Sequence, residues 1–287
     1  MKVSVVGQGY VGLSLALAIE RAGHDVVGFD VNEQLIRNLR NKTSHVETVS
    51  NSELELARNY RATSVPSELS ETEVVILAVP TPIDSSHQPQ LENLIHASQI
   101  VASNLSKPAL VINESTSFPG TLRNLVMGIF EKFGDHVHSF AASPERVDPG
   151  NKLWNQSNTP RLISGIDADS TRKAAEFYSS FCQEVVIVSS PEVAEAAKLF
   201  ENTFRHINIA LVNEFAKICN GLNLDVHEVL NASATKPFGF MKFTPSLGVG
   251  GHCIPVDPHY LKMSAVNVGV KTEFIDLATS VNENMPS

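Results

Sequence analysis

The sequence of 287 residues predicts an α/β fold, a doubly wound parallel sheet, followed by an all-α domain. Short β-branched runs alternate with helical patterns through the first part of the chain. The strand-like runs are apolar throughout, which is typical of a parallel sheet that helices cover on both faces. The pattern changes after Pro191, where a long stretch without glycine or proline begins. We therefore expect two domains, residues 1–190 and residues 191–287.

The alternation in the first domain predicts parallel strands joined by helical crossovers. The strands are expected at residues 3–6, 25–30, 74–79, 109–113, 138–142, 161–164 and 185–188. The helices are expected at residues 11–22, 33–40, 91–105, 120–133 and 170–182.

The second domain begins with apolar residues at helical spacing over residues 192–219. A helix of this length would extend about 40 Å, which suits a connector or dimerisation helix. Further helical patterns cover residues 225–232 and 272–284, and a loop rich in glycine and proline covers residues 236–258.

Composition and charge exclude several classes of protein. The hydrophobic fraction of 43% is that of a globular chain, and the net charge of −9 offers no general basic surface for nucleic acid. The three cysteines form no C-x-x-C pair, which favours a reducing compartment. Glycines interrupt the first apolar run, so no signal peptide is expected, and no apolar stretch is long enough to span a membrane. We expect a cytoplasmic protein.

The segment Gly7-Gln8-Gly9-Tyr10-Val11-Gly12 follows the first strand and opens the first helix. Asp30 ends the second strand. Its separation in sequence from Gly12 is close to the spacing of about 20 residues found in Rossmann-like dinucleotide sites. Backbone N–H groups at this helix N-terminus would bind the pyrophosphate, and Asp30 would bind the adenosine ribose. A carboxylate there repels a 2′-phosphate, so NAD is expected rather than NADP. The alternative is that the glycines only form a sharp turn and Asp30 caps the next helix.

Four polar residues of the long helix, Glu195, Lys198, Asn202 and Arg205, follow spacings that place them on one face. The simplest interpretation is a solvated face with an Arg–Glu pair.

The loop over residues 248–258 has glycines on one side of Cys253 and prolines on the other. Such a loop suits close approach of a ligand. Cys182 and Cys219 fall at the ends of helices and are expected to be packing residues. Two alternatives stay open: a turn with a buried thiol, or a metal site formed by His252, Cys253, Asp257 and His259. Because the spacing matches no common zinc pattern, no metal is expected.

Several motifs together resemble the UDP-glucose/GDP-mannose dehydrogenase family. They are Gly7-x-Gly9-x-x-Gly12, Val79-Pro80-Thr81-Pro82, Glu114-Ser115-Thr116, Ser143-Pro144-Glu145-Arg146, Lys198-Leu199-Phe200-Glu201-Asn202 and Gly250-Gly251-His252-Cys253. The resemblance implies an oxidoreductase that oxidises the C6 alcohol of a nucleotide sugar by four electrons, with two NAD per sugar. It also implies a homodimer through the long central helix.

The resemblance implies that Cys253 holds the intermediate aldehyde as a thiohemiacetal, which becomes a thioester and is then hydrolysed. Lys198 and Asn202 match the pair that stabilises negative charge on oxygen. Asp257 matches a residue that positions water, and Glu145 matches the general base for hydrolysis.

Further residues are implied to contact ligands. Thr116 matches a hydroxyl near the cofactor and the water. Pro80 and Thr81 join the cofactor residues Gly7, Gly9, Tyr10, Val11, Gly12, Asp30 and Thr116. The substrate residues are Glu145, Arg146, Val147, Lys198, Asn202 and Gly250. Thr116 or Glu145 could alternatively cap a helix or a turn, and Asp257 could be a turn residue before Pro258.

The residues that follow Glu145, the segment 146–151, resemble those of family members that act on UDP-N-acetylhexosamines, which implies a substrate such as UDP-GlcNAc, UDP-ManNAc or UDP-GalNAc. UDP-glucose enzymes of the family usually carry Phe-Leu after that glutamate. UDP-glucose and GDP-mannose stay as alternatives, and polysaccharide biosynthesis is the expected context.

Members of the family continue into a third domain that holds much of the UDP group, whereas this sequence ends at Ser287. We therefore expect that the UDP-binding domain is absent, as a result of engineering, proteolysis or natural shortening. Two competing functions follow: a catalytically silent module for NAD binding and dimerisation, or a two-domain hydroxyacid dehydrogenase with a catalytic lysine on the long helix. The second leaves Cys253 without a role.

Overall fold

The computed structural model describes residues 1–147, 151, 153–251 and 253–285. The chain forms two compact units. The sheet unit consists of Met1–Thr81 and Gln90–Lys198, and the helical unit consists of Pro82–Pro89 and Leu199–Ser287. The division along the chain therefore falls inside the long helix α7 (Pro191–Gly221).

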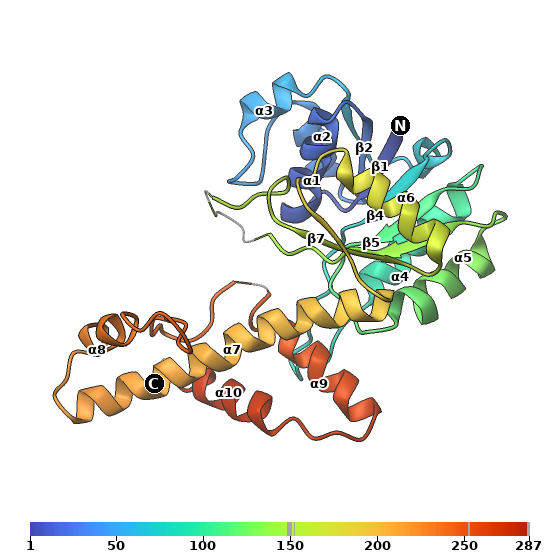
Figure 1. Ribbon diagram of the computed structural model, residues 1–287. Helices are drawn as coiled ribbons and strands as arrows, with labels where there is room; N and C mark the ends of the chain where they lie inside the picture. Colours follow the sequence, from blue (N-terminus) through green and yellow to red (C-terminus); the bar gives the residue numbers. More distant parts are fainter. Residues whose placement is uncertain (148–150, 152, 252, 286–287) are drawn as a thin grey trace. The chain divides into compact units, whose positions relative to one another are not determined.

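The described part of the sheet unit is built on an eight-stranded sheet of order β3-β2-β1-β4-β5-β6-β7-β8 (Figure 1). The strands are β1 (Lys2–Val6), β2 (Asp25–Phe29), β3 (Tyr60–Thr63), β4 (Val74–Leu77), β5 (Leu110–Asn113), β6 (Ser139–Ala142), β7 (Arg161–Gly165) and β8 (Val185–Ile187). The helices are α1 (Tyr10–Arg21), α2 (Glu33–Arg40), α3 (Asn51–Leu56), α4 (Glu92–Asn104), α5 (Met127–Phe133) and α6 (Ala168–Ser179), with short helical turns η1 (Pro66–Leu69) and η2 (Leu122–Val126).

Strand β1 pairs in parallel with both β2 and β4, so the strand order reverses beside it. In open α/β sheets, ligands bind at such a switch point, beyond the carboxyl ends of the strands. The segments that leave β1, β4, β5 and β6 all emerge at this edge, because these strands are mutually parallel.

Alternate residues of the central strands enter opposite hydrophobic cores. Val5 and Ile76 pack with α1, α2 and α6, whereas Val6 and Leu77 pack with α4 and α5. This alternation follows from the two-residue period of a strand, and burial on both faces explains why the strands are apolar throughout.

The α/β sheet followed by helices is confirmed, but the sheet is not wholly parallel. Strand β7 runs antiparallel to β6, with Ala141 opposite Gly165. A parallel pair requires a crossover, usually a helix. The described residues between β6 and β7 contain no helix, so the chain returns alongside β6 in the opposite direction. Strand β3 and helix α3 were not predicted, because Tyr60–Thr63 is short and carries Arg61 in its middle.

The helical unit contains most of α7, then α8 (Val226–Ser233), α9 (Asp257–Asn267) and α10 (Glu273–Glu283). The expected long helix is therefore present, whereas α9 was not predicted, because its start follows a loop dominated by glycine and proline. None of the helices in the described ranges combines the length and apolar content needed to cross a membrane.

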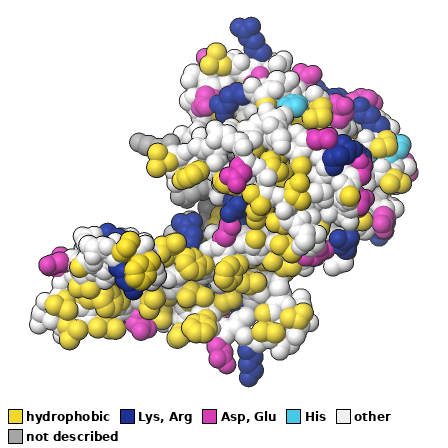
Figure 2. Space-filling view, viewed as in Figure 1, with side chains coloured by type: hydrophobic (Ala, Val, Ile, Leu, Met, Phe, Trp, Pro, Cys, Tyr) yellow, Lys and Arg dark blue, Asp and Glu magenta, His cyan; other side chains and the backbone are white. Residues whose placement is uncertain are grey.

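Large apolar side chains are exposed along the helical unit, and Figure 2 shows them as a broad yellow area over α7 and α8. Four of them on α7 are Phe200 (65% exposed), Phe204 (39%), Leu211 (64%) and Ile218 (49%). A contiguous apolar surface of this kind marks a site of interaction.

Candidate active site

The three glycines of the first turn meet different constraints. A side chain on Gly12 would place its Cβ 1.8 Å from the Gly7 carbonyl oxygen, and one on Gly7 would lie 2.5 Å from the Ala78 oxygen. A Cβ on Gly9, by contrast, would meet no atom within 4 Å. Helix α1 begins after Gly9 with no side-chain cap and no acidic residue in its first turn. The open approach and the uncompensated helix N-terminus fit a pyrophosphate beside Gly9, Tyr10 and Val11.

Asp30 lies at the end of β2 and faces the glycine turn. Its Oδ2 accepts a hydrogen bond from the Gln8 N–H at 2.8 Å, and its Oδ1 accepts one from the Asn32 N–H at 2.9 Å. Asn32, not Asp30, caps α2 by accepting a hydrogen bond from the Leu35 N–H at 3.1 Å. The alternative in which Asp30 caps the next helix is therefore wrong.

Gln8 was not predicted as a site residue, although it shapes the turn. Its buried side chain donates to the Val5 carbonyl at 2.8 Å and accepts a hydrogen bond from the Tyr60 hydroxyl at 2.7 Å. This contact comes from β3, a strand whose position the sequence pattern did not reveal.

The segment after β4 contains the predicted cofactor residues Pro80 and Thr81. The Val79 N–H donates to Ser115 Oγ at 3.0 Å, and Asn93 Nδ2 donates to the Pro80 carbonyl at 3.0 Å. Pro80 is exposed and Thr81 is buried. The first contact holds the end of β4 against the segment after β5, next to Thr116, and the second attaches it to α4.

Thr116 and Lys198 are in direct contact, because Lys198 Nζ donates a hydrogen bond to Thr116 Oγ1. Lys198 is 7% exposed and Glu195 is 2% exposed, whereas Arg205 is exposed. The interpretation of this helix face as solvated is therefore wrong for its first two residues. It describes Arg205 alone.

Glu145 is 8% exposed and emerges beyond β6. Its carboxylate accepts a hydrogen bond from the Val147 N–H at 2.8 Å, and its own N–H donates to the Glu114 carbonyl at 3.3 Å. Burial raises the pKa of Glu145, while the charges of Arg161 and Lys198 act in the opposite direction. A carboxylate whose pKa is raised is a stronger proton acceptor than an ordinary one, which suits a general base. The hydrogen bond from the Val147 N–H also makes Glu145 the cap of a turn, which is the alternative role that the sequence allows.

Arg161 and Glu114 form a buried ion pair whose charges act on Glu145, and sequence reasoning missed both as site residues. Arg161 Nη1 lies 2.9 Å from Glu114 Oε2, and the two side chains are 1% and 0% exposed. The Tyr178 hydroxyl donates a second hydrogen bond to Glu114. Arg146 of the predicted substrate segment donates to the Pro160 carbonyl at 2.9 Å.

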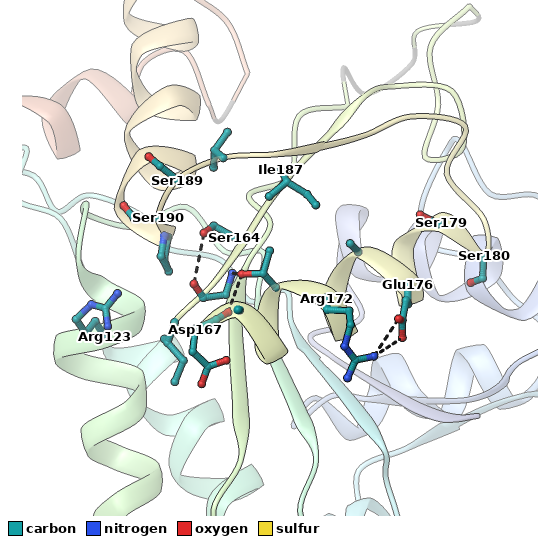
Figure 3. Close-up of a pocket in the computed structure, with 17 residues that line it drawn as sticks. Arg123, Ser164, Asp167, Arg172, Glu176, Ser179, Ser180, Ile187, Ser189 and Ser190 are labelled. Atoms are coloured by element: carbon teal, nitrogen blue, oxygen red, sulfur yellow. Dashed lines mark hydrogen bonds and ion pairs between the residues drawn. The ribbon is translucent and has the colours of Figure 1, made fainter.

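A cavity of about 390 Å³ in the sheet unit separates α1 from Glu145, Val147 and residues 154–157. Tyr10, Val11, Glu145 and Val147 line it, so predicted cofactor and substrate residues share one concave surface. A larger cavity of about 930 Å³ lies between α6 and the connection from β8 to α7 (Figure 3). Arg172 and Glu176 pair with each other along it, and no predicted site residue lines it.

In the helical unit, Asn202 Nδ2 donates to Asp257 Oδ2 at 2.6 Å. Asp257 is 1% exposed and is the first residue of α9. The Cys253 carbonyl accepts hydrogen bonds from the N–H groups of Val256 (3.1 Å) and Asp257 (2.9 Å). Cys253 therefore lies in the turn that leads into α9 and is exposed, whereas Cys182 and Cys219 are buried.

The other arm of the cysteine loop is anchored by two buried asparagines. Asn213 Oδ1 accepts a hydrogen bond from the Ser246 N–H at 2.8 Å, and Asn213 Nδ2 donates to Asn282 Oδ1 at 3.0 Å. Gly248 has φ +98° and Gly251 has φ +81°, in the left-handed region that favours glycine. Gly250, a predicted substrate residue, is exposed.

His252, one of the four residues of the metal alternative, lies outside the described residues. Within the described ranges, no group of three or more histidine, cysteine or acidic side chains could hold a metal ion.

Comparison with protein families identifies the chain. Residues 1–182 match the NAD binding domain of the UDP-glucose/GDP-mannose dehydrogenase family, and residues 192–284 match the central domain of the same family. The chain belongs to this family. It therefore carries the NAD-binding domain of a family of NAD-dependent nucleotide-sugar dehydrogenases.

Known relatives of this family member cover nearly all of its sequence. The chain is 41% identical to a UDP-N-acetyl-D-glucosamine 6-dehydrogenase from Pseudomonas aeruginosa, over 99% of this chain and 68% of the relative. A UDP-D-ManNAc dehydrogenase from Pyrococcus horikoshii has a similar structure, with a TM-score of 0.90, 32% identity, and coverage of 100% of this chain and 69% of the other. A UDP-glucose dehydrogenase from Pyrobaculum islandicum gives a TM-score of 0.93 at 26% identity, covering 99% of this chain and 68% of the other.

Proposed function

We propose that the chain carries the NAD-binding and catalytic domains of a cytoplasmic UDP-N-acetylhexosamine 6-dehydrogenase, which oxidises the C6 alcohol to a carboxylate. The observation that carries the proposal is helix α7. It bears Lys198, bonded to Thr116, and, one turn later, Asn202, bonded to Asp257. An ammonium and an amide one turn apart can both stabilise negative charge on one oxygen.

The glycine turn would hold the pyrophosphate of NAD, and Asp30 would hold its adenosine ribose. The chemistry that the cofactor supplies is hydride acceptance, once in each oxidation. Pro80, Thr81 and Thr116 follow the carboxyl ends of β4 and β5, where the other half of a dinucleotide lies in folds of this class.

Cys253 is the proposed nucleophile. Its thiol would add to the aldehyde carbon to give a thiohemiacetal. Loss of the carbon-bound hydrogen as hydride and of the hydroxyl hydrogen as a proton would leave a thioester, and water would then release the carboxylate and the free thiol. Its exposure in the turn before α9 supports this role, because a nucleophilic thiol must be accessible to the substrate.

Hydrolysis of the thioester requires a group that removes a proton from water. Glu145 is proposed for this step, because it is buried and burial raises its pKa, which makes the carboxylate a stronger base. Asp257 would orient the water, held in place by Asn202.

The choice of substrate rests on the relatives and on the substrate segment. The relative from Pseudomonas aeruginosa is a UDP-N-acetyl-D-glucosamine 6-dehydrogenase. Arg146 and Val147 follow Glu145, where the UDP-glucose enzymes usually carry Phe-Leu. UDP-glucose, GDP-mannose and a catalytically silent module are the alternatives that the experiment must separate.

A homodimer is proposed through the exposed apolar face of α7, which includes Phe200 and Leu211. The apolar area would leave water on association. Sedimentation of the chain across a concentration series tests the dimer directly. A monomer at all concentrations would exclude it.

Turnover tests the enzyme function. NADH formation is measured with each UDP-N-acetylhexosamine, UDP-glucose and GDP-mannose, together with NAD affinity. Two NADH per sugar, abolished by Cys253→Ser and kept by Cys219→Ser, is the expected result, because Cys219 is buried. No NADH with any sugar, despite NAD binding, would leave the silent module.

A further inference from the structure

Glu195 is a buried carboxylate that the proposed reaction does not use. It lies on α7 one turn before Lys198 and is 2% exposed. Burying a carboxylate is costly unless it is paired or hydrogen-bonded, so its partners explain why it is there.

Those partners all belong to the segment that follows Thr116. Glu195 Oε2 accepts a hydrogen bond from the Gly120 N–H at 2.6 Å, and Oε1 accepts one from the Leu122 N–H at 3.0 Å. Ser117 Oγ lies 3.5 Å from the same carboxylate. Gly120 has φ +95°, which turns the chain so that both N–H groups face α7.

The segment from Ser115 to Leu122 is therefore attached to the rest of the unit at three places along its length. Ser115 accepts a hydrogen bond from Val79, Thr116 from Lys198, and Glu195 binds the remainder. Glu195 and Lys198 lie on neighbouring turns of α7. The contacts of both side chains with the segment therefore depend on how α7 packs against it.

We propose that Glu195 is a positioning residue that holds the Thr116 hydroxyl against the Lys198 ammonium. The consequence for catalysis rests on the proposed function, since it assumes that Lys198 and Thr116 act on substrate and cofactor. The placement itself does not depend on turnover. A residue that only stabilised the fold would leave this contact unchanged in the folded protein.

The substitution Glu195→Gln isolates the effect. The amide keeps one acceptor oxygen, but its NH₂ group would face a backbone N–H, so one of the two backbone hydrogen bonds is lost. The side-chain volume is nearly unchanged, so the packing of α7 is retained.

Glu192→Gln is the matched control. Glu192 precedes Glu195 by one turn on α7, and its Oε1 lies 2.9 Å from Arg123 Nε. The control removes a carboxylate from the same helix, and the partner of this carboxylate, Arg123, follows directly after Leu122. It leaves the Gly120 and Leu122 hydrogen bonds in place.

Two readouts separate the possibilities in the full chain. The first is kcat and KM for the sugar, with NAD affinity. The second is the ¹⁵N NMR signal of the Lys198 ammonium, which is assigned with the variant Lys198→Arg. The hydrogen bond to Thr116 slows the proton exchange of this ammonium.

Glu195→Gln is expected to lower kcat about tenfold to a hundredfold, since a displacement near 1 Å has effects of this size, and to broaden the Lys198 signal. Glu192→Gln is expected to change neither.

If Glu195→Gln lowers only the melting temperature and retains both kcat and the Lys198 signal, Glu195 is a structural cap and the proposal is wrong. If the unsubstituted chain turns over no nucleotide sugar, the proposed function fails. The Lys198 signal then still decides the role of Glu195.

Discussion

The sheet unit and the helical unit bury their apolar residues differently. Both hydrophobic clusters found in the described residues lie in the sheet unit, where strands are covered by helices on each face. The helical unit instead exposes large apolar side chains along α7 and beyond it, such as Phe200, Leu211 and Phe274. A unit with a closed core depends on its own packing, whereas an exposed apolar face gains stability when a partner covers it.

The units also differ in how they hold polar groups. The sheet unit buries a complete ion pair, Arg161 with Glu114, and a carboxylate, Glu195, bonded to backbone N–H groups. The helical unit buries the carboxylate of Asp257, which accepts a hydrogen bond from the neutral amide of Asn202, together with the amides of Asn213 and Asn282 and the imidazole of His259. Loss of Arg161, the charged partner of a buried carboxylate, should therefore be damaging in the sheet unit.

The largest effect is expected for Gly12→Val. A Cβ at this position would lie 1.8 Å from a backbone oxygen, and neither group can move without breaking the turn. We expect a loss of about 4 kcal/mol or more in the free energy of unfolding, measured by denaturant titration of the sheet unit's transition. Gly9→Ala is the control, since its Cβ meets no atom, and it should keep the stability. Equal stability of the two variants would contradict the turn geometry.

A smaller loss is expected for Arg161→Leu. Glu114 would be left as a buried charge without its partner, which costs about 3 kcal/mol. Arg172→Leu removes an arginine that pairs with Asp169 and Glu176 at the surface, and its effect should stay below about 0.5 kcal/mol. Urea unfolding measures both. A similar cost for the two would show that the buried pair is not special.

Leu211→Ser tests the exposed face of the helical unit. Because Leu211 is 64% exposed, the fold should be unaffected, but self-association should weaken about tenfold, or about 1.4 kcal/mol. Leu56→Ser, at a 76% exposed position of the sheet unit, is the control. Sedimentation equilibrium reports the dissociation constant. Identical constants for both variants would place the interface elsewhere.

The smallest effect concerns pH. Burial, helped by the charge of His87, lowers the pKa of His259 from 6.5 to about 4. The folded state then binds fewer protons than the unfolded state between these values, so stability falls as the pH falls from 6.5 to 4. His259→Asn should reduce this loss by about 1 kcal/mol.

Glu195 in the sheet unit changes the stability with pH in the opposite direction. Burial raises its pKa from 4.5 to about 7, so the folded state binds more protons and stability falls as the pH rises between these values. Thermal unfolding across the range, with Glu195→Gln beside His259→Asn, measures both slopes. The contrast fails if the two substitutions change the slope in the same direction.

Local patterns were enough for the main elements. The apolar strands, the glycine turn after β1 and the long helix α7 each depend on residues close in sequence, whose periods and backbone requirements are visible there. The same holds for Asp30 at the end of β2. Strand β3 and helix α9 escaped detection, because Arg61 interrupts the first and the cysteine loop precedes the second.

The sequence by itself determined the order of the elements other than α3, β3 and α9, the glycine turn and the types of reactive side chain, because these follow from local periodicity and spacing. Only the tertiary structure decided which side chains are buried and what they contact. Glu195 was assigned to a solvated face because its partners, Gly120 and Leu122, are distant in sequence. The direction of β7 and the pairing of Arg161 with Glu114 have the same origin, since packing between remote segments sets them.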